Sequence, residues 1–188
     1  DAVQVKHYVT GDDALISLAG PANKQGRIIA DNICGGDSHY LGSQGSSVIK
    51  VFDMTAATTG INETNAKKSG LEVDTVILSP MSHAGYYPGG KVMTMKVVFE
   101  KETYRLLGAQ IIGYEGVDKR IDVLATAIHA GLKATQLKDL DLAYAPPYSS
   151  AKDPVNMAGF MIDNIAKGTL KQWHLEDMDK ISKDKNAV

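Results

Sequence analysis

Apolar and polar residues alternate along residues 92–100, a pattern typical of a strand with one buried face. A short polar turn at 101–103 separates this segment from residues 104–113, which form a second apolar run. Two such runs joined by a short turn predict an antiparallel hairpin. The apolar face of the first strand consists of Met93, Met95, Val97 and Phe99.

Two shorter apolar runs, residues 48–53 and 74–78, predict two further buried strands. Between them, residues 62–69 predict a short helix that ends before Gly70. The intervening segment 54–60 is small and threonine-rich, and its pattern assigns it to no element.

A first helix is predicted after Gly20-Pro21, with Gly20 as the N-cap and Pro21 in the first helical position. Gly35-Gly36 ends it. Its apolar residues recur at helical spacing and predict a packing face made of Ala22, Ile29 and Ile33. Residues 1–20 show little periodicity.

Two more helices follow in the second half of the chain. One begins after Gly116, with Asp118 as a possible cap, and ends at Gly131. Its apolar residues are Ile121, Leu124, Ala125 and Ile128. The other begins at Asp153-Pro154, an N-cap followed by proline in the first helical position.

These elements predict an α+β fold in which an antiparallel sheet has helices packed on one face. The polar, glycine- and serine-rich stretch 37–47 marks a composition shift, so we expect a domain boundary near it. We expect residues 1–45 to belong to one domain and 46–167 to a second. Residues 168–188 carry alternating acids and lysines after Trp173 and predict a linker or tail.

Composition then narrows the class of protein. The chain has 188 residues, 44% of them hydrophobic, and a formal net charge of −2. Such a balance favours neither nucleic acid nor an anionic membrane as a partner, and no apolar run approaches the ~18 residues of a membrane span. The single cysteine, Cys34, indicates a reducing compartment, so we expect a cytoplasmic protein. The first residues, Asp1-Ala2, lack an initiator methionine, and we expect a piece of a longer protein.

The loop at residues 140–153 holds the strongest candidate chemistry. Pro146-Pro147 keeps it out of helix and central strand, and a helix N-terminus, which favours anions, follows directly. Tyr144, Tyr148 and Lys152 could therefore act on an anionic or redox substrate. The alternative is a proline-rich connector whose tyrosines only pack. The sequence contains no glycine-rich nucleotide fingerprint, phosphate-binding loop, CxxC pair or metal-ligand spacing.

Asp1-Ala2 is followed by five further stretches in a fixed order. They are SLAGPANKQGRIIADNI, KVFDMTAATTG, HAGYYPG, GVDKRIDVLATAI and AYAPPYSSAKDPVNMAG. In this order they resemble the C-terminal part of a flavin-dependent pyridine nucleotide-disulfide oxidoreductase. Within that superfamily they are similar to coenzyme A-disulfide reductase and to its NADH oxidase and persulfide reductase relatives. The resemblance covers residues 1 to about 167, and it implies a remnant of an FAD-binding domain followed by a reductase dimerisation domain.

The resemblance implies cofactor-binding roles near the start of the chain. Asp1 corresponds to the aspartate that hydrogen-bonds the ribityl chain of FAD. The alternative interpretation of Asp1 is a frayed chain terminus. Leu18 and Ala19 correspond to the backbone that approaches the flavin pyrimidine edge, and Ala22 belongs to the helix that opens there. A helix N-terminus aimed at this edge would stabilise negative charge on the reduced ring.

The resemblance also implies substrate roles. Tyr86 and Tyr144 correspond to the two tyrosines that approach the active-site cysteine of the partner subunit in a homodimer, where a phenol can protonate a leaving thiolate. Lys152 corresponds to a residue that binds a phosphate of coenzyme A. Tyr87 and Tyr148 rank second. The alternative for each tyrosine is interface packing with a satisfied hydroxyl.

The functional prediction is therefore a flavoprotein that passes electrons from NAD(P)H through FAD and a cysteine to coenzyme A disulfide or persulfide. The redox cysteine would precede Asp1, and Cys34 does not correspond to it. One alternative is an NADH oxidase or peroxidase that reduces oxygen or peroxide. A second is that this chain alone is a non-catalytic, colourless dimerisation module without retained FAD. The segment around Trp173 resembles the lead-in to a rhodanese domain.

Overall fold

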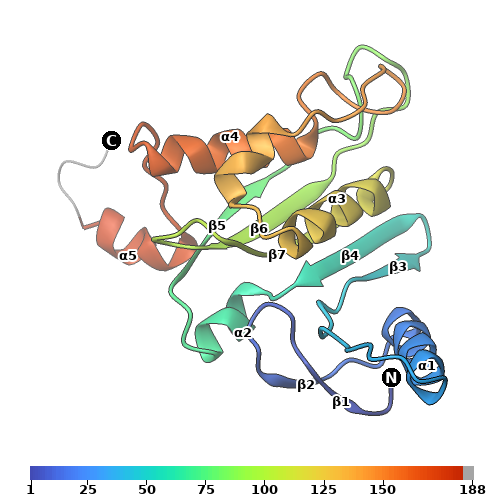
Figure 1. The fold of residues 1–188 in the computed structure, drawn as a ribbon. Helices are drawn as coiled ribbons and strands as arrows, with labels where there is room; N and C mark the ends of the chain where they lie inside the picture. The colour runs from blue at the N-terminus through green and yellow to red at the C-terminus, as the bar shows by residue number, and fades with distance from the viewer. Residues whose placement is uncertain (184–188) are drawn as a thin grey trace.

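The computed structural model describes residues 1–183, and at its centre lies a five-stranded antiparallel sheet (Figure 1). The strands lie in the order β3-β4-β7-β6-β5, and every neighbouring pair is antiparallel. They are β3 (Ser47–Val51), β4 (Met54–Gly60), β5 (Val73–Leu78), β6 (Thr94–Glu100) and β7 (Leu106–Gly113).

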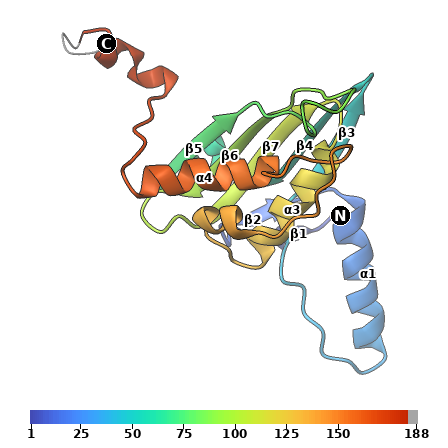
Figure 2. The ribbon, with the colours of Figure 1, turned by 90° about the horizontal axis from the view of Figure 1, so that it is seen from above.

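Two helices, α3 (Val117–His129) and α4 (Pro154–Ala166), lie side by side across one face of this sheet (Figure 2). A short 3₁₀ helix, η1 (Ala134–Asp139), packs against α4, and α2 (Glu63–Lys68) joins β4 to β5. The predicted α+β class, with an antiparallel sheet and its helices on one face, is confirmed. The sequence pattern did not predict η1.

The alternation predicted for residues 92–100 is confirmed, because Met93, Met95, Val97 and Phe99 are all buried, although the strand itself starts at Thr94. Val98 departs from the pattern, since it points to the other face and is also fully buried. Its cross-strand partner is Gly108, which lies against the backbone of Ile61 as the chain leaves β4 for α2. A Cβ at Gly108 would stand 2.0 Å from the Ile61 carbonyl oxygen, so this close crossing requires glycine there.

The threonine-rich segment 54–60 is strand β4, which the pattern left unassigned, and the predicted strand 48–53 is shorter and ends at Val51. The two form a tight hairpin whose tip is Phe52, 93% exposed and at φ +52°. The pattern failed here because β4 holds small residues. Only Ala57 and Thr59 of this strand are buried, and alanine and threonine give a weak hydrophobic alternation.

The N-terminal part contains β1 (Gln4–Lys6), β2 (Asp13–Leu15) and the helix α1 (Ala19–Ile33). The hairpin β1–β2 was not predicted, because three residues a strand are too few to show a period. Helix α1 is confirmed, but it starts before Pro21 and its N-cap is Leu18 instead of Gly20.

The apolar face predicted for α1 is exposed in the described chain. Ile29 is 59% exposed and Ile33 is 80% exposed, and α1 has no buried residue. A helix normally gains its stability by burying such a face. This face is therefore a surface that the described residues leave uncovered.

The predicted tail is not wholly irregular, because η2 (Leu175–Asp177) and α5 (Met178–Ile181) lie in it. It is also tied to the edge strand β5: the side-chain amide of Gln172 donates to Asp74, and His174 Nε2 lies 2.8 Å from the same carboxylate. The end of the predicted tail, residues 184–188, lies outside the described residues, and Trp173 is exposed as expected.

Replacing Glu63 with glutamine tests the attachment of α2 to the sheet. Hydrogen bonds from Lys67 and then Lys96 lower the pKa of Glu63 to about 2. A lowered folded-state pKa stabilises the fold above the unfolded value of roughly 4.3, and this contribution disappears as the pH falls toward the folded value. We expect E63Q to lower the free energy of unfolding by about 0.5–1 kcal/mol at neutral pH.

Urea unfolding of both proteins at a series of pH values measures this difference. It should shrink as the pH falls below roughly 4. Glu102→Gln, at an exposed position in the turn between β6 and β7, is the control and should change little. A difference between E63Q and wild type that stays constant down to pH ~2 would contradict the assignment.

Candidate functional site

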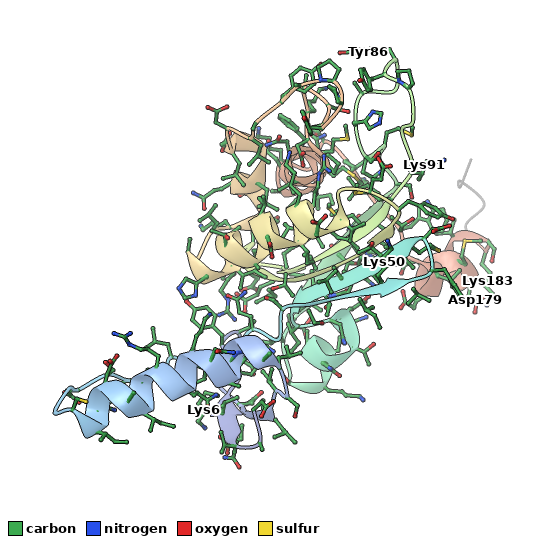
Figure 3. The ribbon with its side chains drawn as sticks, turned by 90° about the vertical axis from the view of Figure 1, so that its right-hand side faces the viewer. Lys6, Lys50, Tyr86, Lys91, Asp179 and Lys183 are labelled. Carbon is green, nitrogen blue, oxygen red and sulfur yellow. The ribbon has the colours of Figure 1, made fainter. Side chains whose placement is uncertain are left out.

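Two loops meet at one end of the molecule and bring two tyrosines together. One loop, residues 79–93, joins β5 to β6 and carries Tyr86; the other, residues 140–153, joins η1 to α4 and carries Tyr144. The two hydroxyl oxygens are 2.6 Å apart. Tyr86 is 77% exposed and Tyr144 is 45% exposed, so the pair stands at the surface, and Figure 3 shows Tyr86 at one end of the molecule.

The two hydroxyl groups of Tyr86 and Tyr144 share one hydrogen bond. One hydroxyl donates to the other, which leaves the second proton free to point outward. The hydrogen bond between Tyr144 and Tyr86, with a smaller effect of burial, raises the pKa of Tyr144 above its ordinary value. Tyr144 therefore stays protonated at neutral pH, and the pair can act as a proton donor but is a poor base.

The second-ranked tyrosines lie beside this pair. Tyr148 is 73% exposed on the same loop as Tyr144. Tyr87 packs edge-on against the buried ring of His83, with 5.7 Å between ring centroids. Lys152 is exposed at the end of the loop, two residues before α4. The structure thus gathers all the predicted substrate residues on two adjacent loops.

The N-terminus of α4 is not open to a foreign anion. Asp153 is its N-cap, as predicted, and one carboxylate oxygen accepts from the backbone N–H of Val155 at 3.0 Å. Pro154 and Val155 in the first turn are buried. The anion that the sequence pattern placed at this helix end is therefore Asp153 itself.

The pattern missed Arg120, which holds this part of the molecule together. Its guanidinium is 1% exposed and donates to Asp153 at 2.9 Å. The same guanidinium reaches the carbonyl oxygen of Ser82 and the hydroxyl of Ser149, one in each tyrosine loop. A signal existed in the sequence, because Arg120 occupies the apolar stripe of α3, where a charge needs a buried partner.

The carboxyl group of Asp153 remains ionised although it is only 2% exposed. Burial alone would raise its pKa. Hydrogen bonds from Arg120, from the Ser149 hydroxyl at 2.6 Å and from the Val155 backbone outweigh burial and hold the pKa below its ordinary value. Arg120 and Asp153 thus form a charged, fully hydrogen-bonded ion pair inside the fold.

A cavity of about 500 Å³ lies beside the tyrosine pair. It extends from Tyr144 and Tyr148 down to Arg120 and is bordered by Lys119 of α3. The ammonium of Lys119 lies 3.9 Å from Asp153 and donates to the carbonyl of Ala143 at 3.4 Å. Most of the surface that lines the cavity is apolar, and its charged lining residues are Glu115, Lys119 and Arg120.

The four residues with implied cofactor roles lie together at the start of α1. The hydroxyl of Ser17 donates to the carbonyl of Asp1 at 3.3 Å, which places the first residue beside Leu18. Leu18 and Ala22 bracket the first helical turn and are half-buried, and Ala19 is exposed. Small side chains and an accessible helix start fit the edge of a flat ring system, although they provide only one edge of such a site.

This cluster is far from the tyrosine pair within one chain. Helix α1 lies at the opposite end of the molecule from Tyr86 (Figure 3). Cys34, the C-cap of α1, is exposed and also lies away from the tyrosines. One copy of the chain therefore cannot bring the two groups of predicted residues into a single site.

Across residues 1–183, no group of three or more His, Cys, Asp or Glu side chains is placed to hold a metal ion. None of the helices described is long and apolar enough to cross a bilayer.

Comparison with known proteins identifies the sheet and its helices. Residues 46–155 match the model of the pyridine nucleotide-disulphide oxidoreductase dimerisation domain. The chain is 38% identical over 155 residues to an NAD(P)H sulfur oxidoreductase (CoA-dependent) of Pyrococcus abyssi, covering 82% of this chain and 34% of that protein. It is also 38% identical over 148 residues to a coenzyme A disulfide reductase of Staphylococcus epidermidis, covering 78% and 33%.

A solved structure of a related reductase has the same fold. The reduced CoADR-RHD of Bacillus anthracis superposes with a TM-score of 0.94 and 48% sequence identity, over 98% of this chain and 33% of that one. The chain thus spans about a third of the length of the proteins it matches. The match spans all five strands of the sheet and α3, and this chain belongs to the pyridine nucleotide-disulphide oxidoreductases and carries their dimerisation domain.

Proposed function

We propose that this chain is the C-terminal dimerisation part of a longer flavoprotein that reduces coenzyme A disulfide or persulfide with electrons from NAD(P)H. The observation that carries the proposal is the hydrogen-bonded pair Tyr86–Tyr144 on two converging loops. The names of the relatives, a coenzyme A disulfide reductase and a CoA-dependent sulfur oxidoreductase, support the substrate class. The chain's share of their length supports a longer protein.

In the proposed reaction the tyrosines supply a proton. Attack of a cysteine thiolate on the disulfide forms one S–S bond and releases coenzyme A as a thiolate. The outward-pointing phenol of the pair donates its proton to that leaving sulfur, and the second phenol stabilises the resulting phenolate through the shared hydrogen bond. The raised pKa of Tyr144 keeps the donor protonated between turnovers.

The remaining substrate and cofactor residues have positional roles in this proposal. Lys152, exposed on the same loop as Tyr144, would bind a phosphate of coenzyme A as a point charge. Asp1, Leu18, Ala19 and Ala22 would hold the ribityl chain and pyrimidine edge of FAD. When bound, FAD would carry electrons from NAD(P)H to the cysteine. The start of α1 would favour negative charge on the flavin edge.

The proposed domain boundaries follow the same scheme. Residues 1–45 would complete an FAD-binding domain, whose missing part would cover the exposed face of α1 at Ile29 and Ile33. Residues 46–167 would form the dimerisation domain, and 168–188 a linker or tail that could lead to a rhodanese domain.

A homodimer would bring the separated groups into one site. The tyrosine pair of one chain lies far from the start of its own α1, so it would serve the cofactor held by the partner (Figure 3). The sheet face opposite α3 and α4 offers the contact. Ile49 and Ile112 are 60% and 45% exposed there, and they line a groove of about 410 Å³. The side-chain amide nitrogen of Gln110 is buried in this face without a hydrogen-bond partner, which a second copy could supply.

Replacing Tyr144 with phenylalanine in the full-length protein tests the proposal. Proton donation by a positioned acid contributes about 10²–10⁴-fold, and Tyr86 can still supply part of it. We therefore expect kcat for coenzyme A disulfide to fall about tenfold, while NADH-dependent reduction of oxygen changes little. Stopped-flow and steady-state assays with both acceptors measure the two rates.

The control removes a hydroxyl elsewhere. Tyr8→Phe deletes the hydrogen bond from Tyr8 to the carbonyl of His129 at 2.9 Å and should leave both rates unchanged. Unchanged disulfide reduction in Y144F would sink the assigned role. Efficient turnover of oxygen or peroxide with no disulfide activity would establish the oxidase alternative. A full-length protein without bound flavin would leave only a non-catalytic dimerisation module.

A further inference from the structure

The two tyrosine loops share an internal anchor. Arg120 of α3 donates to the carbonyl of Ser82 at 2.9 Å, four residues before Tyr86. It also donates to the carbonyl of Tyr148 at 3.4 Å, four residues after Tyr144. One rigid, planar side chain thus holds both loops from beneath.

Short hydrogen bonds link this anchor to the tyrosines. The backbone N–H of Ala84 donates to the carbonyl of Ser149 at 2.9 Å, which joins the two loops directly. The N–H of Tyr87 donates to the carbonyl of Ala84, which closes a turn around Tyr86, and the N–H of Tyr148 donates to the carbonyl of Ala145, which closes a turn directly after Tyr144. The distance between the Tyr86 and Tyr144 hydroxyls is therefore set by the backbone beneath them.

The anchor itself is rigid because its charges are buried and saturated. Asp153 accepts from two guanidinium nitrogens of Arg120, from the Ser149 hydroxyl and from the first turn of α4. Gly116, at φ +68°, admits the guanidinium, because a Cβ there would lie 2.0 Å from an Arg120 nitrogen. Lysine could not reproduce this fork of donors.

We propose that Arg120, locked by Asp153 and Ser149, is a positioning residue that sets the contact between the Tyr86 and Tyr144 hydroxyls. Its guanidinium is 1% exposed, and its nitrogens are bonded to atoms of the protein. It acts by fixing the register of the two loops that carry the phenols. The expected effect of Arg120 on disulfide reduction rests on the proposed function, whereas its effect on the contact between the two tyrosine hydroxyls does not.

The test uses Arg120→Lys, which keeps the charge and removes the fork, and Ser149→Ala, a milder second variant that removes the hydroxyl bonded to Asp153. Tyrosine ¹³Cζ NMR of the chain, with Tyr144→Phe to assign the signal, follows the ionisation of Tyr144. We expect the pKa of Tyr144 to fall toward the ordinary value of about 10 as the pair separates. In the full-length protein, kcat for coenzyme A disulfide should fall about 10- to 100-fold with the KM for NAD(P)H unchanged.

Arg105→Lys is the matched control, since Arg105 bonds the carbonyl of Val9 at 3.4 Å, away from both loops, and its replacement should leave the Tyr144 signal in place. Unchanged ionisation of Tyr144 in folded R120K and S149A proteins would overturn the positioning role. A shifted Tyr144 signal with unchanged disulfide turnover would support the positioning role and refute the proposed function. If R120K does not fold, S149A alone decides between these results.

Discussion

Replacing Asp153 with alanine is expected to lower the free energy of unfolding of this chain by about 3–5 kcal/mol. Arg120 would remain inside the protein, 1% exposed, without its counterion. Breaking a buried pair by removing one partner is costly because the remaining charge keeps its desolvation penalty. The loss of the N-cap of α4 adds about 1 kcal/mol to the effect. Urea unfolding monitored by circular dichroism measures the difference.

The control separates the cap from the ion pair. Asn62 is the N-cap of α2 and accepts from the N–H of Asn65 at 2.8 Å, but it has no buried arginine beside it. Asn62→Ala should therefore cost only about 1 kcal/mol. Equal losses in the two variants would show that the Arg120–Asp153 pair contributes nothing to stability.

The same prediction has a pH signature. The pKa of Asp153 is lowered in the folded state, so its contribution is complete above the unfolded value of roughly 3.9. It disappears as the pH falls through the lower folded value. The deficit of D153A relative to wild type should therefore be constant near neutral pH and shrink only in strong acid. A deficit that grows on acidification would contradict the sign of this shift.

Sequence patterns predicted the fold best where large apolar residues recur. The alternation of Met95, Val97 and Phe99 predicted β6, and the 3.6-residue spacing from Ile121 predicted α3. Strand β4 escaped because alanine and threonine bury little surface and leave no clear period. The hairpin β1–β2 escaped because it is held by backbone pairing over three residues a strand.

The candidate site was only partly predictable for a related reason. Tyr86 and Tyr144 are 58 residues apart in the chain, and nothing in their spacing brings their hydroxyls together. Their pairing was suggested by the resemblance of the surrounding stretches, and the structure gives the contact its geometry. Arg120 could have been suspected from its place on an apolar stripe. Its partners come from two separate loops, Ser82 from one and Ser149 and Asp153 from the other, which only the fold brings together.

The uncovered sheet face supports the second large prediction. Replacing Ile112 with glutamate should convert a dimer of this chain into a monomer. Ile112 lies in β7, at the centre of the sheet, and its side chain lines the groove on the face opposite α3 and α4. In a two-fold symmetric interface each substitution occurs twice, and a truncated or charged central residue typically costs about 2–4 kcal/mol. Two such losses exceed what a moderate interface can absorb.

Sedimentation equilibrium of the purified chain gives the mass, and absorbance near 450 nm shows whether flavin is retained. Ile29→Glu is the control, because Ile29 is 59% exposed on α1, away from the sheet face. I29E should remain dimeric, since we assign the α1 face to the rest of the FAD-binding domain and not to the second copy. If I29E were monomeric and I112E dimeric, the dimer interface would lie on α1 instead of on the sheet face. A wild-type chain that is monomeric at all concentrations would remove the reason to place Tyr86 and Tyr144 in a partner's site, because one copy alone keeps them apart from the start of α1.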